Sequence, residues 1–232
     1  YSFSTWGDTN PGIGVARSER PDGPFTDTGK ILDTASSGVP NSIDPFYFQT
    51  GSGQRYLFWG SFNGIYGQEI APDMRTLTGA KFKIAGNAFE ATYIYEKDGK
   101  FWFFGSNGTC CEGADSKYHL SVAVADTIAG PYKTKDGKNI LNNGQEGTPF
   151  LHGDSNTGWV GPGHNAEIIR DDNGRYFILY HAIASKNPLL PNGGATRRPL
   201  MMDEIIWGND NWPTIAGGLP SSTPRQAPYF KN

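Results

Sequence analysis

The chain is poor in cysteine, has no marked excess of either charge and contains no long apolar run. A formal net charge of −3 provides no electrostatic basis for binding nucleic acid or an anionic membrane. No apolar stretch approaches the length of a membrane-spanning helix. We therefore expect neither nucleic acid nor a membrane among the partners of this protein.

The two cysteines, Cys110 and Cys111, are adjacent in the sequence. Two neighbouring thiols are neither a disulfide framework nor a zinc ligand set. We expect a buried pair of small apolar residues, since free cysteine is often buried in this way. The alternative is a strained disulfide between the two neighbours that shapes a loop at a pocket.

Glycine, proline and aromatic residues are abundant instead: 31 Gly, 16 Pro and 13% aromatic residues in a chain of 232. No long stretch has the apolar period of a helix. A chain of this length can bury a sizeable core as one domain. The composition therefore favours a single all-β domain, covering residues 1–232, that is rich in turns.

Residues 86–106 predict a β-hairpin. The first half is β-branched and aromatic, the second is almost wholly apolar, and Lys97-Asp98-Gly99 between them has the residues of a tight turn. Glu90 interrupts the apolar run of the first strand. Because a carboxylate in such a strand is costly to desolvate, Glu90 needs partners or a chemical task.

The same hairpin pattern recurs over residues 41–61 and 164–181. Repeats of about this size, each of four short strands, are typical of a β-propeller. We expect blades over the following segments, with 136–160 as a long connection and irregular packing after Gly217: residues 1–35 (the outer part of one blade), 36–80, 84–135 and 161–215.

Polar residues occupy one fixed place in these repeats. When the turn glycines Gly53, Gly99 and Gly174 are aligned, Asp44 and Glu90 fall at the same distance before them. Asn165 takes that place in the third copy, next to His164. The innermost strand of each propeller blade runs along the central axis, so we expect Asp44, Glu90 and His164 to share one pocket.

Paired carboxylates in an aromatic, polar pocket suit glycoside hydrolysis. One acid donates a proton to the leaving oxygen, while a second group activates water or attacks. Glu90 is the candidate acid, and Asp44 could orient it or bind a sugar hydroxyl. The alternative for Asp44 is a turn residue before Pro45.

Other residues are candidates for contact with the sugar or with an ion. Trp59, Phe62 and Trp102 could stack on a sugar ring, although most aromatic residues at such spacing belong to the core. We also expect Asn107 and Arg198 to bind substrate. His164 could donate hydrogen bonds on the axis or contact a central cation through water.

At these residues the chain resembles glycoside hydrolase family 43, of the arabinanase, arabinofuranosidase and xylosidase type. The resemblance covers nearly the whole chain and rests on the order and spacing of several motifs. They are Ile13-Gly-Val-Ala-Arg-Ser, Asn41-Ser-Ile-Asp-Pro, Gly60-Ser-Phe-Asn-Gly-Ile65, Phe89-Glu-Ala-Thr-Tyr-Ile, Cys110-Cys111, Gly130-Pro-Tyr, Gly161-Pro-Gly-His-Asn165 and Trp207 through Trp212-Pro.

The resemblance implies a five-bladed β-propeller and an inverting hydrolase that cleaves α-L-arabinofuranosyl or β-xylosyl linkages in plant cell-wall polysaccharide. Glu90 matches the general acid of the family, and Asp44 matches the aspartate that tunes the pKa of the acid and orients it. His164 matches an axial histidine that often lies beside a calcium or sodium ion.

Nothing in the sequence matches the aspartate that is the family's general base. We expect an incomplete propeller of about three and a half to four blades, truncated at the N-terminus and open to self-association through an unpaired blade edge. Asp8 lies in the wrong element to serve as the base, but would be the first replacement to test. A secretion signal would not be visible here, and a secreted or periplasmic location is expected.

Two other functions remain open from the sequence. The chain could be a non-catalytic sugar-binding propeller, or an inactive fragment without its general base. A retaining carboxylate pair, as in related five-bladed sucrose and fructan enzymes, is a weaker alternative. The residues encoded upstream of Tyr1 would separate the first two functions.

Overall fold

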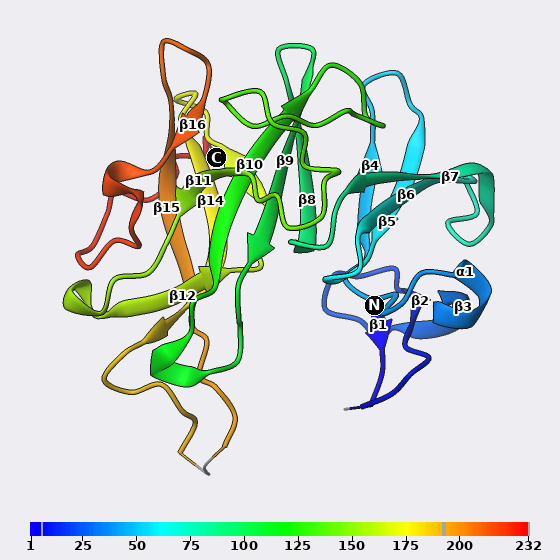
Figure 1. Cartoon of the computed structure of the whole chain (residues 1–232), viewed down its shortest axis with the longest axis horizontal. Coiled ribbons are helices and arrows are strands. Elements are labelled where there is room, and N and C mark those ends of the chain that lie inside the picture. The colour runs from blue at the N-terminus through cyan, green and yellow to red at the C-terminus, as the bar shows by residue number, and fades with distance from the viewer. Residues whose placement is uncertain (6, 192–193, 232) are drawn as a thin grey trace.

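The computed structural model describes residues 1–5, 7–191 and 194–231, and its regular structure is almost entirely β (Figure 1). The strands form four antiparallel sheets that follow one another along the chain. Each sheet is built from strands that are consecutive in the sequence, as in the blades of a propeller. The predicted all-β, incomplete propeller is confirmed.

The sheets contain three, four, four and five strands in chain order. The first is β1 (Ser2–Phe3), β2 (Gly12–Arg17) and β3 (Thr26–Asp33), followed by helix α1 (Thr34–Ser37). The second is β4 (Phe46–Gln49), β5 (Arg55–Trp59), β6 (Ile65–Ile70) and β7 (Leu77–Ala85). The third is β8 (Glu90–Lys97), β9 (Lys100–Asn107), β10 (His119–Ala125) and β11 (Thr148–Leu151). The fourth is β12 (Trp159–Gly163), β13 (Ile168–Arg170), β14 (Tyr176–Ala184), β15 (Leu200–Trp207) and β16 (Pro213–Thr214). Short 3-10 turns span Gly113–Asp115, Ser155–Thr157 and Ala216–Gly218.

The central hairpin has the turn that its sequence predicts. Lys97 pairs with Lys100 across β8 and β9, and the two residues between them have positive φ, 53° at Asp98 and 72° at Gly99. Two such residues are what a tight two-residue hairpin turn requires, because their twist matches that of the flanking strands.

Two predicted boundaries are wrong. The second sheet continues through β7 to Ala85, and the long connection expected over 136–160 contains β11 and the start of β12. Pro149 lies within β11, and a proline cannot donate to a strand ladder. A strand of four residues with a proline has too weak a pattern to be recognised from sequence.

Three apolar clusters fill the spaces between neighbouring sheets. One joins the first and second sheets around Ile13 and Trp59, and another joins the second and third around Phe58 and Phe103. The last joins the third and fourth sheets around Phe104. Each sheet is therefore held by packing against the next, so that the inner strands β4, β8 and β13 have fixed positions.

The C-terminal segment packs irregularly against the body, as expected. The backbone N–H of Ser221 donates to Asp203 at 3.1 Å, and that of Tyr229 donates to Asp171 at 3.1 Å. Within the described part of the chain, no helix is long and apolar enough to cross a membrane.

Candidate active site

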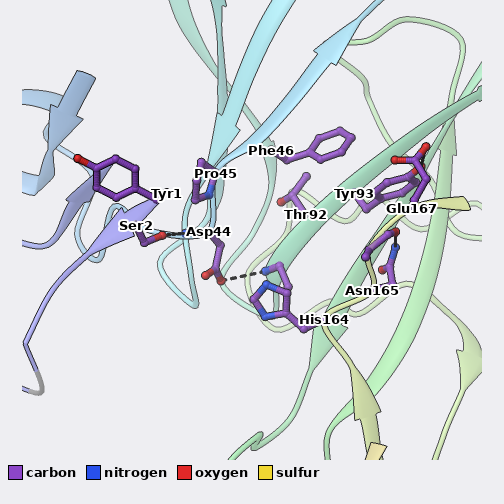
Figure 2. Close-up of a pocket in the computed structure, with 12 residues that line it drawn as sticks. Tyr1, Ser2, Asp44, Pro45, Phe46, Thr92, Tyr93, His164, Asn165 and Glu167 are labelled. Atoms are coloured by element: carbon purple, nitrogen blue, oxygen red, sulfur yellow. Dashed lines mark hydrogen bonds between the residues drawn. The ribbon is translucent and has the colours of Figure 1, made fainter. Parts of the chain in front are cut away.

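The starts of β4 and β8 and the segment before β13 meet at one cavity of about 650 Å³ (Figure 2). Asp44, Ala91 and His164 line it, and so do residues deeper along the same inner strands, such as Phe46 and Tyr93. The structure therefore brings together three segments that lie far apart in the sequence, where the aligned repeats predicted a shared pocket.

Asp44 and Glu90 are joined through the backbone. The N–H of Ala91, the residue after Glu90, donates to Asp44 Oδ2 at 3.2 Å, and the N–H of Asp44 donates to Ser2 Oγ at 3.0 Å. Figure 2 shows the carboxylate of Asp44 accepting this hydrogen bond, drawn as a dashed line, beside the imidazole of His164. Asp44 is thus a fixed link between two blades rather than a simple turn residue.

Four residues around this end of the axis have left-handed backbone. The φ angles are 56° at Asp44, 53° at Phe62, 55° at Ala91 and 45° at His164. Such conformations cost about 1–3 kcal/mol each for residues other than glycine, and they tend to gather at functional sites. The strain at this end of the fold supports a functional role for it.

The carboxyl group of Asp44 is partly withdrawn from water. Burial raises the pKa of Asp44, and the negative charge of Glu90 raises it further. His164 and the Ala91 N–H act in the opposite direction by favouring the anion, but the net shift of the Asp44 pKa is upward.

Glu90 itself lies beside the cavity rather than in its lining. Tyr118 Oη donates to Glu90 Oε1, and Ser61 Oγ donates to Glu90 Oε2 at 3.0 Å. A partly buried carboxylate with a donor on each oxygen is well compensated for its desolvation.

Two residues that line the cavity each have a buried polar atom without a protein partner. Thr92 Oγ1 and Asn165 Oδ1 are buried and unbonded, although Asn165 Nδ2 donates to the carbonyl of Ala166 at 3.0 Å. Buried oxygens of this kind usually contact water or an ion. Among the residues that the structure describes, no group of three or more His, Cys, Asp or Glu side chains could hold a metal.

Three of the predicted sugar contacts are wrong. Trp59 and Trp102 are 0% and 3% exposed and belong to the apolar clusters between sheets. Asn107 is fully buried, where Nδ2 donates to the carbonyl of Ala88 at 2.7 Å and Oδ1 accepts from Ser121. These three side chains support the blades and have no surface for a ligand.

The other two predicted sugar contacts are accessible. Phe62 is 38% exposed, and its N–H donates to the carbonyl of Phe89, the residue before Glu90, at 2.8 Å. Arg198 is exposed on the connection between β14 and β15, and its positive charge helps to lower the pKa of His181. Both residues remain candidates for binding substrate.

Sequence reasoning missed three residues around Glu90: Ser61, Tyr118 and His181. The Tyr118 ring stacks on His181 with centroids 5.7 Å apart and planes 12° apart. Burial, Arg198 and His164 lower the pKa of His181 to about 4, which keeps its imidazole neutral. Only Ser61 carried a signal, because it lies in the Gly60-Ser-Phe-Asn-Gly stretch that was noted for its resemblance.

One further expectation is corrected, and the structure also places Asp8. Cys110 and Cys111 form a disulfide, and Cys111 is exposed, so the interpretation as a buried apolar pair is wrong. The disulfide belongs to the loop between β9 and β10, which ends next to Tyr118. Asp8 lies in an exposed turn, where it accepts the N–H of Asn10 at 2.8 Å, and is not among the residues that line the cavity.

Comparison with known proteins connects this geometry to a family. The profile described as Glycosyl hydrolases family 43 matches residues 1–213. The extracellular endo-α-(1→5)-L-arabinanase 1 of Bacillus subtilis is 30% identical over 221 residues, which are 92% of this chain and 63% of that protein. A probable arabinan endo-1,5-α-L-arabinosidase C of Aspergillus niger is 32% identical, covering 93% of this chain and 69% of that protein.

Solved structures agree with the fold. The α-L-arabinanase of Cellvibrio cellulosa superposes with a TM-score of 0.79 at 25% identity, over 93% of this chain and 71% of that one. A family 43 endo-arabinanase of Bacillus licheniformis superposes with a TM-score of 0.77 at 30% identity, over 92% of this chain and 71% of that one. The chain thus spans roughly two thirds of the length of these relatives, and slightly less of the B. subtilis enzyme.

Proposed function

This chain belongs to family 43 of the glycosyl hydrolases, and from that membership we propose that the protein is a glycoside hydrolase that cleaves α-L-arabinofuranosyl linkages in arabinan. The observation that carries the proposal is the pairing of Glu90 and Asp44 through the Ala91 N–H at the axial cavity. Several relatives are named for arabinan, and this favours arabinofuranosyl over xylosyl linkages.

In the proposed reaction Glu90 is the general acid. It donates its proton to the oxygen that leaves with the departing sugar. Asp44 holds the Ala91 backbone, and with it the start of β8, so that Glu90 approaches the glycosidic bond in one orientation. Phe62 and Arg198, which are accessible on loops of the second and fourth sheets, would contact the substrate.

We propose the inverting stereochemistry that the resemblance implies. An inverting enzyme needs a second carboxylate roughly 6.5–9.5 Å from the acid to activate water on the opposite face of the sugar. We assign no residue of this chain to that role, because Asp44 is bound to Ala91 and Asp8 lies outside the cavity.

A cation on the axis is also a proposal. His164 lines the cavity, and the neighbouring Asn165 has a buried amide oxygen without a protein partner, of the kind that hard cations prefer. Because no three-residue ligand group occurs among the described residues, His164 would contact such an ion through water. The ion would supply positive charge near the acid.

The proposal includes a location outside the cytoplasm. Relatives are named extracellular, and the disulfide between Cys110 and Cys111 is of a type that persists in oxidising compartments.

The test is hydrolysis of linear α-1,5-linked arabino-oligosaccharides, followed by proton NMR of the first product formed. Release of arabinose units with the β configuration at the new reducing end supports an inverting arabinan hydrolase. Binding of the same oligosaccharides without any hydrolysis would instead favour the sugar-binding alternative. If the protein neither binds nor hydrolyses these oligosaccharides, the proposal is refuted.

A further inference from the structure

The carboxylate of Glu90 is held on both oxygens by hydroxyl groups from other parts of the chain. Tyr118 Oη donates to Oε1, and Ser61 Oγ donates to Oε2 at 3.0 Å. Tyr118 is 1% exposed and Ser61 is 2% exposed. These contacts are therefore shielded from solvent, where a hydrogen bond to a charged group is strongest.

The Tyr118 ring packs against two residues of the fourth sheet. Gly163 and His181 are paired on β12 and β14, so both face the ring from the same side. His181 stacks on the ring, and a Cβ added at Gly163 would lie 2.3 Å from Tyr118 Cδ1. Only glycine at position 163 leaves room for the ring, so that the phenol is directed at Glu90.

The direction of the Tyr118 hydrogen bond is also determined. An ionised carboxylate has no proton to donate, so the hydrogen bond between Tyr118 and Glu90 runs from the phenol to Oε1. Burial and the charge of Glu90 raise the pKa of Tyr118, so the phenol keeps its proton.

The two hydroxyls therefore differ in what they can do. Tyr118 is a fixed donor, and an oxygen that accepts from a fixed donor is a poor place for a second proton. A serine hydroxyl rotates, so Ser61 can donate to the carboxylate and accept from the protonated carboxyl group. The proton that Glu90 transfers consequently lies on the Ser61 side.

We infer that Tyr118 is a positioning residue for Glu90: its hydrogen bond fixes Oε1 and leaves Oε2, the oxygen bound by Ser61, as the one that delivers the proton to the leaving group. This assignment rests on the proposed function of Glu90 as the general acid. It assigns Tyr118 and Ser61 to the proposed active site, and it identifies Oε2 as the oxygen of Glu90 that carries the transferred proton.

The test follows the titration of Glu90 directly. Protein labelled with ¹³C at glutamate carboxyl carbons is titrated by NMR, and the Glu90 signal is assigned by its loss in Glu90→Gln. Tyr118→Phe removes one hydroxyl and keeps the stacked ring. Because the anion loses a charge-assisted hydrogen bond, the midpoint of the Glu90 titration should move upward by about one pH unit or more.

Two variants serve as comparisons. Ser61→Ala should move the midpoint less than Tyr118→Phe, because Ser61 serves both protonation states. Tyr180→Phe is the matched control, since Tyr180 is also 1% exposed and donates to a carboxylate, that of Asp203. It should leave the Glu90 midpoint unchanged. An unchanged midpoint in Tyr118→Phe, or a larger shift in Ser61→Ala, would overturn the inference.

A second readout needs no substitution. The buried Tyr118 hydroxyl proton should give a downfield signal that moves with pH at the same midpoint as the Glu90 carbon, and a pH-independent signal would contradict the assignment. Neither experiment depends on turnover. Absence of hydrolysis with the expected titration shift would therefore refute the proposed function, whereas normal hydrolysis without the shift would refute only the role of Tyr118.

Discussion

The backbone N–H of Ala91 donates to the carboxylate of Asp44 at 3.2 Å, across the space between two blades. Ala91 has a φ of 55° and Asp44 a φ of 56°, so both residues take an unusual backbone conformation to make this contact. Glu90 immediately precedes Ala91. The contact consequently sets the orientation of Glu90 from a carboxylate that lies on another inner strand, as the proposed reaction requires.

Replacing Glu90 by glutamine should abolish hydrolysis and preserve the fold. A carboxamide has almost the same shape, and its oxygen can accept from Tyr118 while its NH2 donates to Ser61 Oγ, but it cannot donate an acidic proton. Loss of general acid catalysis costs about 10²–10⁴-fold in rate. The measurement is turnover of an unactivated arabino-oligosaccharide. Glu96→Gln, on the same strand β8, is the matched control and should retain activity; near-normal turnover by Glu90→Gln would show that another group is the acid.

Asp44→Asn should slow hydrolysis less than Glu90→Gln does. The amide oxygen of asparagine can still accept the Ala91 N–H, so the orientation of β8 is largely retained while the negative charge is lost. We expect kcat to decrease by about 10²-fold or less, which is the loss that a displacement of a catalytic group by about 1 Å can cause. Side-by-side measurement of kcat for the two variants tests the order, and a larger loss in Asp44→Asn would assign the proton transfer to Asp44.

Asp44→Asn should also stabilise the protein at neutral pH. The pKa of Asp44 is raised in the folded state, so folding favours its protonated form, and stability is lost as pH rises through that raised pKa. Asparagine does not ionise, so the variant does not lose stability in this way as the pH rises. The gain should be present at neutral pH and disappear below the pKa of an unfolded aspartate. Urea unfolding at several pH values provides the measurement, and a destabilised Asp44→Asn at neutral pH would mean that His164 and Ala91 outweigh burial.

His181 should make the protein sensitive to acid. Its pKa is about 4 in the folded state against 6.5 when unfolded, so unfolding takes up a proton between these values. Stability is complete above pH 6.5 and falls by up to about 3 kcal/mol as pH decreases through 6.5 toward 4.

His181→Phe should remove this dependence while keeping a ring on which Tyr118 can stack. The Nε2 atom of His181 is buried without a partner, so the change breaks no hydrogen bond there. Comparison of unfolding free energies at pH 7 and pH 4.5 tests the prediction. His119→Phe is a suitable control, because its imidazole faces Glu146 on the surface. Equal acid sensitivity in the protein with and without His181 would exclude this residue as its source.

The order of the blades could be predicted because its causes are local. Alternating apolar residues, Asp98-Gly99 turn chemistry and a repeated hairpin are readable in short windows of sequence. The same repeats place Asp44, Glu90 and His164 at equivalent ends of inner strands. Their meeting at one cavity then follows from the propeller arrangement alone.

The partners of Glu90 could not be predicted in this way. Ser61 and Tyr118 lie 29 and 28 positions from Glu90 along the chain, and reach it from different loops. Trp59 and Phe62 look alike as aromatic candidates in the sequence, yet the first is fully buried and the second exposed. Such differences depend on how neighbouring sheets pack.

The amino-acid sequence by itself determined an all-β repeat of hairpins and the alignment of its acidic residues, since strand period and turn chemistry act between near neighbours. Only the tertiary structure decided that Asn107 supports a blade and that Cys110 is bonded to Cys111. It also decided that the Tyr118 ring packs on Gly163 and His181, so that its hydroxyl reaches Glu90. Those outcomes rest on side chains brought together by packing between sheets, where burial and the nearest donor decide what each group does.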